Sequence, residues 1–461
     1  MMLHNEADRK NEDSEPCLPP PSSCQKAQIV PTHHTTPALP PTQSTTTQAV
    51  TTTSLPLPAA TSKKKKERNS HDLLLETLDV LLSCFVVAPC VIAYWRGTWE
   101  LIGVLIFPQN IPLSALCSFL IGGIGHFVFT LTQRFFIDHI HPDKHRLTYY
   151  VISRCYTFVF GIVCVNMWRG SWVLCDWLTS ASSLIIICIV TSVAVLFLIA
   201  TRTVRNLGAA PYSVIMDHKS DYFDVETMFK IAGFQQPGLY VMDTLFSIFV
   251  IGTLVVIAWR GLWGIMDLTV YPGEKAKSAW SSLIMGYVTV GFTFVLHPFV
   301  RWVCKRIDGI FKLIFCDVYY FAEFFGAVNA WRGIWNLLDV YVYPDNLILS
   351  YWLTHVIPFL ILAALKCSNS ILVRGVYLDA DGVGGECVDI PIHYVRLHFE
   401  RERKKRSMGF GYGHHHPHQT KPTNLLVKTP NDKNAQRVLI EKPMKSEIKI
   451  QSGMDAATQL V

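Results

Sequence analysis

Charged side chains are scarce in this 461-residue chain. Asp, Glu, Lys and Arg together make up 16% of the residues, whereas apolar residues make up half. Water-soluble domains typically carry about 25% charged residues. The mean hydropathy is positive, at +0.28, although both ends of the sequence are polar. This composition argues against an ordinary soluble protein and indicates an integral membrane protein.

The sequence also lacks the short motifs of common catalytic and binding sites. It contains no phosphate-binding loop, no nucleophile elbow and no zinc-type spacing. Asp379–Gly382 resembles the start of a calcium loop, but Val383 and Ile390 stand where ligands are needed, so we reject this interpretation. The histidines of residues 414–418 and the basic cluster of residues 401–406 are interpreted as incidental and solvated. We therefore expect no enzyme activity, no cofactor, no metal ion and no nucleic-acid partner.

No apolar run precedes Leu73, so no signal peptide is expected and the first spanning helix should direct its own insertion. Most of the 13 cysteines lie inside apolar runs, which is not the pattern of a secreted disulfide framework. We interpret them as reduced thiols that pack within the protein. Those in apolar runs are Cys84, Cys90, Cys117, Cys155, Cys164, Cys188 and Cys316.

Eight apolar stretches of about 20 residues follow the polar start of the chain, and each is close to the length that crosses hydrocarbon. Because a bilayer tolerates only helices or closed barrels, they predict an all-α membrane protein with about eight transmembrane helices. The stretches are residues 74–95, 112–132, 147–168, 178–200, 239–259, 279–300, 311–331 and 347–366.

The distribution of Lys and Arg predicts the orientation. The loops after the even-numbered helices carry ten of these residues and those after the odd-numbered helices carry six. The positive-inside rule then places both termini in the cytoplasm.

Composition divides the chain into five regions. The two long polar ends have the composition of disordered tails, and the tail after the last helix contains two β-rich runs, at residues 370–379 and 387–395, that predict a hairpin. The regions are a Pro/Thr-rich cytoplasmic arm (1–70), a first four-helix half (71–200), a cytoplasmic loop (201–238), a second four-helix half (239–366) and a cytoplasmic tail with the hairpin and the basic cluster (367–461).

One motif, W-R-G-x-W, occurs four times. The first two copies begin 73 residues apart and the last two begin 72 apart, which indicates a repeated pair of helices. Copies 1 and 3 share an aspartate, Asp79 and Asp243, and copies 2 and 4 share V-N-x-W-R-G, so we expect two parallel four-helix halves. The motif residues are Trp95, Arg96, Gly97 and Trp99; Trp168, Arg169, Gly170 and Trp172; Trp259, Arg260, Gly261 and Trp263; and Trp331, Arg332, Gly333 and Trp335.

Each copy follows an apolar stretch, so we expect it to close an odd-numbered helix at its outer end. Arg would then meet the negative end of the helix dipole, Gly would take a left-handed conformation and the Trp residues would lie in the interfacial belt. An aspartate follows eight residues after the first Trp in three copies (Asp176, Asp267 and Asp339), which suggests a local Arg–Asp pair. Copy 1 has Gly103 at that place, and Glu100 is the available substitute. A ring of arginines that receives an anion or a partner is the alternative.

Charges inside spans are costly and usually face protein, water or one another. Glu323 is the deepest acid, eight residues before Trp331, and His126 also lies within a span, as do His297 and His355. A proton or cation path through Glu323 and a histidine is one interpretation, and a structural role is the other. Arg154, near the cytoplasmic boundary, is expected to snorkel or to pair with an acidic neighbour.

With four W-R-G-x-W copies, eight expected spans and polar tails, the chain resembles the fuseless family of animal multipass membrane proteins over roughly residues 72–366. The resemblance implies a location in presynaptic plasma membranes and a part in organising release sites and presynaptic calcium channels. It brings no catalytic residues. We therefore expect an organiser or accessory of a presynaptic ion-channel complex, with lipid and membrane proteins such as calcium channels as partners. The alternative is a solute transporter or channel with a midplane site near Glu323.

Overall fold

The computed structural model describes residues 70–397, apart from 142–143, 180–182, 218–221, 232 and 234, together with residues 399 and 403. Within these residues the regular secondary structure is entirely helical. The arm predicted over residues 1–70, apart from the backbone of its last residue, and the tail after residue 403 lie outside the described residues.

All eight apolar stretches coincide with helices over most of their described residues. Two of them are continuous helices with a wider π-helical turn in the middle. The segments are α1 (Ser70–Leu82), η1 (Ser83–Val87) and α2 (Ala88–Leu105); α3 (Ile111–His139); α4 (Arg146–Thr179); α5 (Leu184–Ala200); α6 (Pro237–Leu245), η3 (Phe246–Gly252) and α7 (Thr253–Thr269); α8 (Lys275–Cys304); α9 (Gly309–Tyr341); and α10 (Leu347–Ala364).

Six helices of the described chain are long and apolar enough to cross a membrane. They are Leu73–Leu105, Ile111–His139, Arg146–Thr179, Pro237–Thr269, Lys275–Cys304 and Leu347–Ala364. Helix α5 is apolar but shorter, and α9 carries more charge. The helices thus show a multipass membrane protein, while the count of eight spans stays a prediction.

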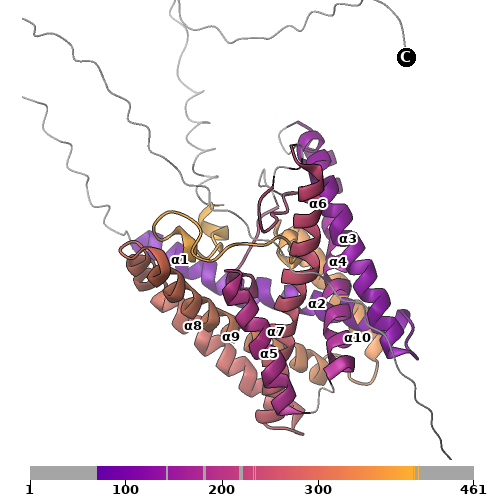
Figure 1. Cartoon of the computed structure of the whole chain (residues 1–461). Coiled ribbons are helices and arrows are strands. Elements are labelled where there is room, and N and C mark those ends of the chain that lie inside the picture. The colour runs from indigo at the N-terminus through magenta and orange to yellow at the C-terminus, as the bar shows by residue number, and fades with distance from the viewer. Residues whose placement is uncertain are drawn as a thin grey trace, which may run out of the picture. The chain divides into compact units, whose positions relative to one another are not determined.

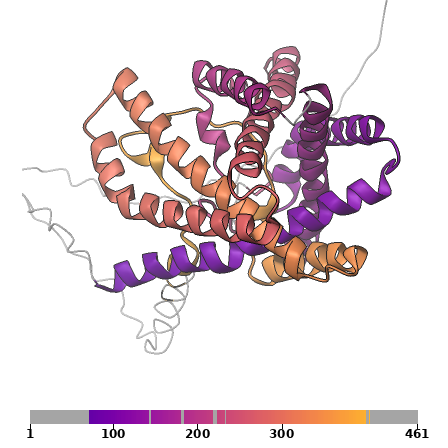
Figure 2. The same ribbon diagram turned by 90° about the horizontal axis from the view of Figure 1, so that it is seen from below.

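The helices pack in four pairs, each made of an inner and an outer helix. The inner helices α2, α4, α7 and α9 carry the W-R-G-x-W motifs, and their partners are α10, α3, α5 and α8, respectively. Figure 1 shows α8 beside α9 and α3 beside α4. The last helix, α10, returns to the first inner helix, α2, as Figure 2 shows from below. Contacts between the inner helices join the four pairs around a centre.

The two π-helical turns lie at matched positions, because Ser83 and Ser247 are 164 residues apart, as are the first Trp residues of copies 1 and 3. Ser83 donates a hydrogen bond to the carbonyl of Pro211, and Ser247 Oγ accepts one from Met228 N–H at 2.9 Å. Such turns leave backbone and side-chain groups free for other partners. Here they attach the loop between α5 and α6 to the bundle.

Two polar segments, residues 201–236 and 366–397, pack on each other through reciprocal contacts. The Asp379 carboxylate accepts from the first two N–H groups of η2 (Val204–Leu207), at 2.8 and 2.7 Å. The Asp217 carboxylate accepts from those of η4 (Ser368–Ile371), at 2.9 and 2.8 Å. Since a buried carboxylate needs several donors, this exchange holds the two segments together. A short turn, η5 (Glu386–Val388), follows.

The hairpin predicted over residues 370–379 and 387–395 is wrong. Val376 N–H donates to Glu226 O, and Pro391 O accepts from Val214 N–H, both at 2.9 Å. The β-rich runs thus satisfy backbone groups of the loop between α5 and α6 rather than each other, and no strand forms in the described part of this tail.

Candidate functional site

The four motifs lie inside helices rather than at their ends. Each inner helix continues about ten residues beyond the first Trp of its motif, to Leu105, Thr179, Thr269 and Tyr341. The expected capping by Arg and the left-handed Gly are therefore wrong. The motif arginines are buried among partners of the protein itself, so the helices have no need to end where the charge appears.

The motif tryptophans form two rings. In each ring every indole meets its two neighbours edge to face, with centroids 5.4 to 5.6 Å apart in the first ring and 5.7 to 5.9 Å apart in the second. This geometry is a favoured one for aromatic pairs. The first ring consists of Trp95, Trp168, Trp259 and Trp331, and the second of Trp99, Trp172, Trp263 and Trp335.

Three first-ring indoles also donate hydrogen bonds to the polar segments. Trp95 Nε1 donates to Ile371 O at 2.9 Å, and Trp259 Nε1 donates to Leu207 O at 3.1 Å. Trp331 Nε1 donates in the same way to the carbonyl of residue 210, at 2.8 Å. Buried indole N–H groups require such acceptors, so the polar segments fix the orientation of the ring.

The arginines form ion pairs between copies. Arg96 Nε lies 2.6 Å from Asp339, which belongs to copy 4. Arg260 of copy 3 pairs with Asp176 of copy 2 at 2.6 Å. Arg332 of copy 4 pairs with Asp267 of copy 3 at 2.8 Å.

The expected pairing within one copy is therefore wrong. Within one copy the Arg and the Asp are seven residues apart, which separates them by about 10.5 Å along the helix axis. The aspartate of the neighbouring inner helix instead lies in direct contact with the arginine. Each of these three arginines thus binds the aspartate of the preceding copy around the ring.

The junction between copies 1 and 2 differs. Arg169 Nη1 donates to Ser118 Oγ at 2.9 Å and interacts electrostatically with Glu100. Gly103 stands where the other copies have aspartate, and a Cβ atom there would lie 3.4 Å from Arg169 Nη2. Among the described ion pairs none closes this junction.

The motif glycines admit the outer helices. A Cβ at Gly97 would lie 2.5 Å from the backbone N of His355 on α10, and one at Gly170 would lie 2.3 Å from that of Phe119 on α3. At Gly333 the same atom would lie 2.6 Å from a backbone N of α8. Gly261 faces Thr191 of α5 just as closely. Only glycine permits this approach, as at many membrane helix interfaces.

Two cavities flank the first ring. The smaller, about 180 Å³, is lined by the eight motif tryptophans and Glu100. The larger, about 420 Å³, is lined by three indoles of the first ring, both polar segments, His126 and Glu323. Because first-ring indoles line both cavities, this ring lies between them. Indole faces and a carboxylate give the smaller cavity a surface that attracts cations.

Glu323 and His126 line the same cavity, but no hydrogen bond or ion pair of the described residues joins them. Glu323 Oε1 is buried without a hydrogen-bond partner among the described atoms. His126 Nδ1 and Nε2 instead lie 3.0 and 3.3 Å from the carbonyls of Gly122 and Val373. Of these two ionisable groups that line the cavity, Glu323 is therefore the one with an atom, Oε1, that has no hydrogen-bond partner among the described atoms.

Sequence reasoning treated residues 201–238 as a linker and missed Asp217. This carboxylate forms an ion pair with Arg154, whose Nη2 lies 2.9 Å from Asp217 Oδ2. Asp217 and Asp379 are 162 residues apart, close to the repeat offset of 164. An alignment of the two polar segments at an offset of 162, two residues short of the repeat offset, would have revealed the matched acids.

Comparison with known proteins gives one match. A family model described as Fuseless matches residues 74–372, which include all four motif copies, the whole of the polar segment of residues 201–236 and the first residues, 366–372, of the other. No curated protein and no solved structure matches the chain.

Proposed function

The chain belongs to the Fuseless family over well over half of its length, and from this premise we propose that it organises or assists a presynaptic ion-channel or release-site complex. Calcium channels are the proposed partners, and the presynaptic plasma membrane is the proposed location. The role is non-catalytic, because it rests on holding other membrane proteins in place.

The aromatic centre of the helix assembly is the observation that carries this proposal. Two rings of edge-to-face indoles and three ion pairs with buried arginines join the inner helices there. Such packing favours one fixed arrangement of the inner helices. A protein that positions partners needs this rigidity.

The outer helices supply surfaces for lipid and for partner helices. Their exposed apolar side chains include Ile124 on α3, Ile189 on α5, Val288 on α8 and Leu360 on α10. Helix association in a bilayer depends on packing between such faces. These surfaces support a role in assembly with other membrane proteins.

The polar segments support the proposed orientation. Residues 201–236 and 366–397 pack together and against the first helix, because Val395 N–H donates to Asp79 and Ser83 donates to Pro211. The loop between α5 and α6, which is rich in Lys and Arg, and the start of the C-terminal tail thus share one end of the bundle, as expected if both lie in the cytoplasm.

The test is a rescue experiment in neurons that lack the protein. We expect the density of calcium channels at release sites and the evoked release to fall, and both to recover with the wild-type chain. Glu323→Gln should rescue equally well, because the amide keeps hydrogen-bonding capacity and a positioning role needs no proton. Unchanged channel density without the protein would contradict the proposal.

A solute transporter or channel is the second candidate, favoured by the cavity of about 420 Å³ that contains Glu323. Buried acids beside a polar cavity are typical of ion and proton pathways. In proteoliposomes, a proton- or cation-dependent flux that the wild type supports and Glu323→Gln abolishes, with unchanged melting temperature, would favour this candidate over the organiser.

A further inference from the structure

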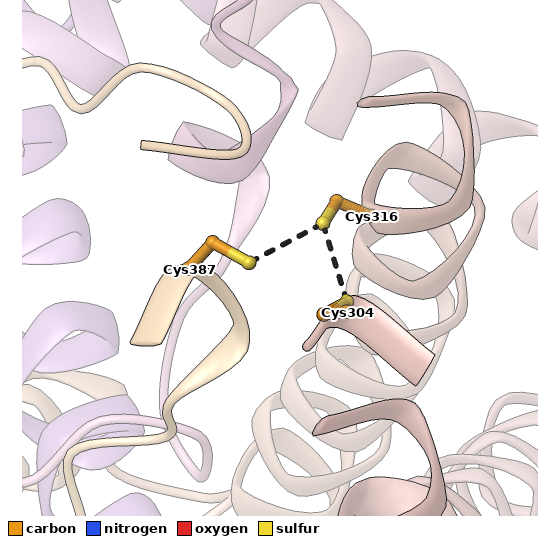
Figure 3. Close-up of side chains that lie close together, drawn as sticks. All are labelled: Cys304, Cys316 and Cys387. Atoms are coloured by element: carbon orange, nitrogen blue, oxygen red, sulfur yellow. Dashed lines mark hydrogen bonds between the residues drawn. The ribbon is translucent and has the colours of Figure 1, made fainter. Parts of the chain in front are cut away.

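Three buried thiols converge where α8 ends, α9 begins and the C-terminal polar segment passes. This thiol cluster consists of Cys304, Cys316 and Cys387, which are at most 1% exposed. Figure 3 shows the three side chains pointing toward one another from three separate elements. Cys316 Sγ lies 3.7 Å from Cys304 Sγ and 3.6 Å from Cys387 Sγ, and all three sulfur atoms lie within 4.8 Å of one another.

These separations suit three ligands of one metal ion. A disulfide would require about 2.05 Å, so the thiols are not bonded. With metal–sulfur bonds of about 2.3 Å, the sulfur atoms of a tetrahedral zinc site lie about 3.8 Å apart. Van der Waals contact between thiols permits similar distances, so the surroundings of the cluster must decide between a metal site and simple packing of thiols.

The surroundings contain a buried cation without an acidic partner. Lys312 is only 8% exposed, and its Nζ donates to Gly382 O at 3.1 Å. No ion pair of the described residues includes it, although it interacts electrostatically with Cys304 and Cys387. A buried ammonium needs a compensating negative charge. Three thiolates around a divalent ion carry a net charge of −1 and would provide it.

The positive charges of Lys312 and Arg205 also interact electrostatically with Cys387. Thiolates are the form that binds metal ions.

We propose that the thiol cluster is a binding site for a thiophilic metal ion, with Zn²⁺ as the ion that the sulfur separations fit. Three thiolates leave one tetrahedral position for an additional ligand, and Cu⁺, which prefers the same soft ligands, is the competing occupant. Binding releases the thiol protons to solvent and involves no redox step.

The bound ion would join the C-terminal segment to the helix bundle. Cys387 begins the run of residues 387–391 that lines the larger cavity. Zinc would therefore hold this wall in place, and removal of the ion would release it. The inference is independent of the proposed synaptic role, because it concerns only this chain's own thiols.

The test begins with the full chain, purified in detergent without chelators and supplied with Zn²⁺ or, in a separate reducing arm, Cu⁺. Elemental analysis should find about one zinc per chain. Cys387→Ser should lose at least tenfold in zinc affinity, whereas Cys188→Ser, which removes an exposed thiol on α5, should bind like the wild type. One copper per chain, with zinc excluded, would reassign the ion but support the site.

A second measurement uses only the wild-type chain, so that a poorly folding variant cannot decide the outcome. Chelation should lower the melting temperature and expose three additional cysteines to alkylation, and zinc should reverse both changes. Less than a tenth of an equivalent of either metal, or unchanged alkylation after chelation, would overturn the proposal.

Discussion

At the scale of single residues, the buried arginines are the most demanding feature of the molecule. Arg96 is completely buried, and it donates to Asp339 as well as to Ser350 and Thr354 on α10, at 3.1 and 3.2 Å. Removing one partner of such a network leaves the other uncompensated, which typically costs about 3–5 kcal/mol. The pairs should therefore behave as energetically coupled units.

A double-mutant cycle tests which residues are coupled. Arg96→Ala and Asp339→Ala should show a coupling of roughly 0.5–3 kcal/mol, because their side chains are in contact. Arg332→Ala with the same Asp339→Ala serves as the matched control and should be additive within about 0.5 kcal/mol. Denaturant unfolding in detergent measures both cycles. Coupling only in the control would show that the pairs form within copies after all.

The motif glycines give a second prediction at this scale. Gly333→Ala should destabilise the protein, because the new Cβ would meet the backbone of Leu283 at 2.6 to 2.7 Å. Gly291→Ala on α8 is the control, since nothing lies within 4 Å of its Cβ position and alanine favours helix by about 1 kcal/mol. Thermal unfolding should show a lower melting temperature for the first variant only. Equal effects would contradict the close approach of α8 and α9.

Sequence reasoning identified the motif residues but not their partners. The four copies stand out because repetition is visible in one dimension. Arg96 and Asp339, however, are 243 residues apart, and no local spacing encodes such a contact. The capping hypothesis failed for the same reason: a charge in an apolar stretch looks terminal until a buried partner is known.

At the scale of elements, the junction between α2 and α4 lacks the Arg–Asp ion pair that the structure describes at the other three junctions. Gly103→Asp should place a carboxylate beside Arg169 as in the other three copies and stabilise the protein by about 1.5–3 kcal/mol, the net value of a hydrogen bond to a charged group. Gly103→Asn keeps the shape without the charge and should gain less.

The melting temperatures of the two Gly103 variants, measured in detergent at low and high salt, provide the check. A loss of stability with aspartate but not with asparagine would mean that Glu100 already supplies the charge that Arg169 needs.

Helix positions were predictable because the thickness of hydrocarbon sets a local length, and each stretch of about 20 apolar residues became a helix. The π-helical turns were not predictable, since Ser83 and Ser247 owe their roles to the distant loop that they bind. The tail failed similarly, because Val376 finds its acceptor in the loop between α5 and α6.

At the scale of the whole molecule, the distribution of charge predicts one testable arrangement. An epitope inserted in the exposed turn at Gly273 should be labelled on intact cells, whereas epitopes within residues 1–70 or 407–461 should require permeabilisation. Immunofluorescence with and without detergent checks this. Surface labelling of either terminal region would reverse the assignment of sides.

The packing of α10 against α2 was beyond sequence reasoning, although both helices were predicted. Their contact joins the first and the last of the predicted helices. The sequence of an apolar stretch does not show which other helix it will contact. Helix pairing in a bilayer depends on small residues and polar contacts, and Gly97 and Ser350 reveal theirs only once the two helices are adjacent.

A ring with three strong joints and one weak joint does not yield evenly. Heat, lateral pressure in the membrane or the pull of a bound partner would separate α2 from α4 first, since Gly103 leaves Arg169 without the contacting aspartate of the other joints and only with the electrostatic attraction of Glu100. The molecule therefore has a built-in line of weakness, and any widening of its first tryptophan ring would start between Trp95 and Trp168.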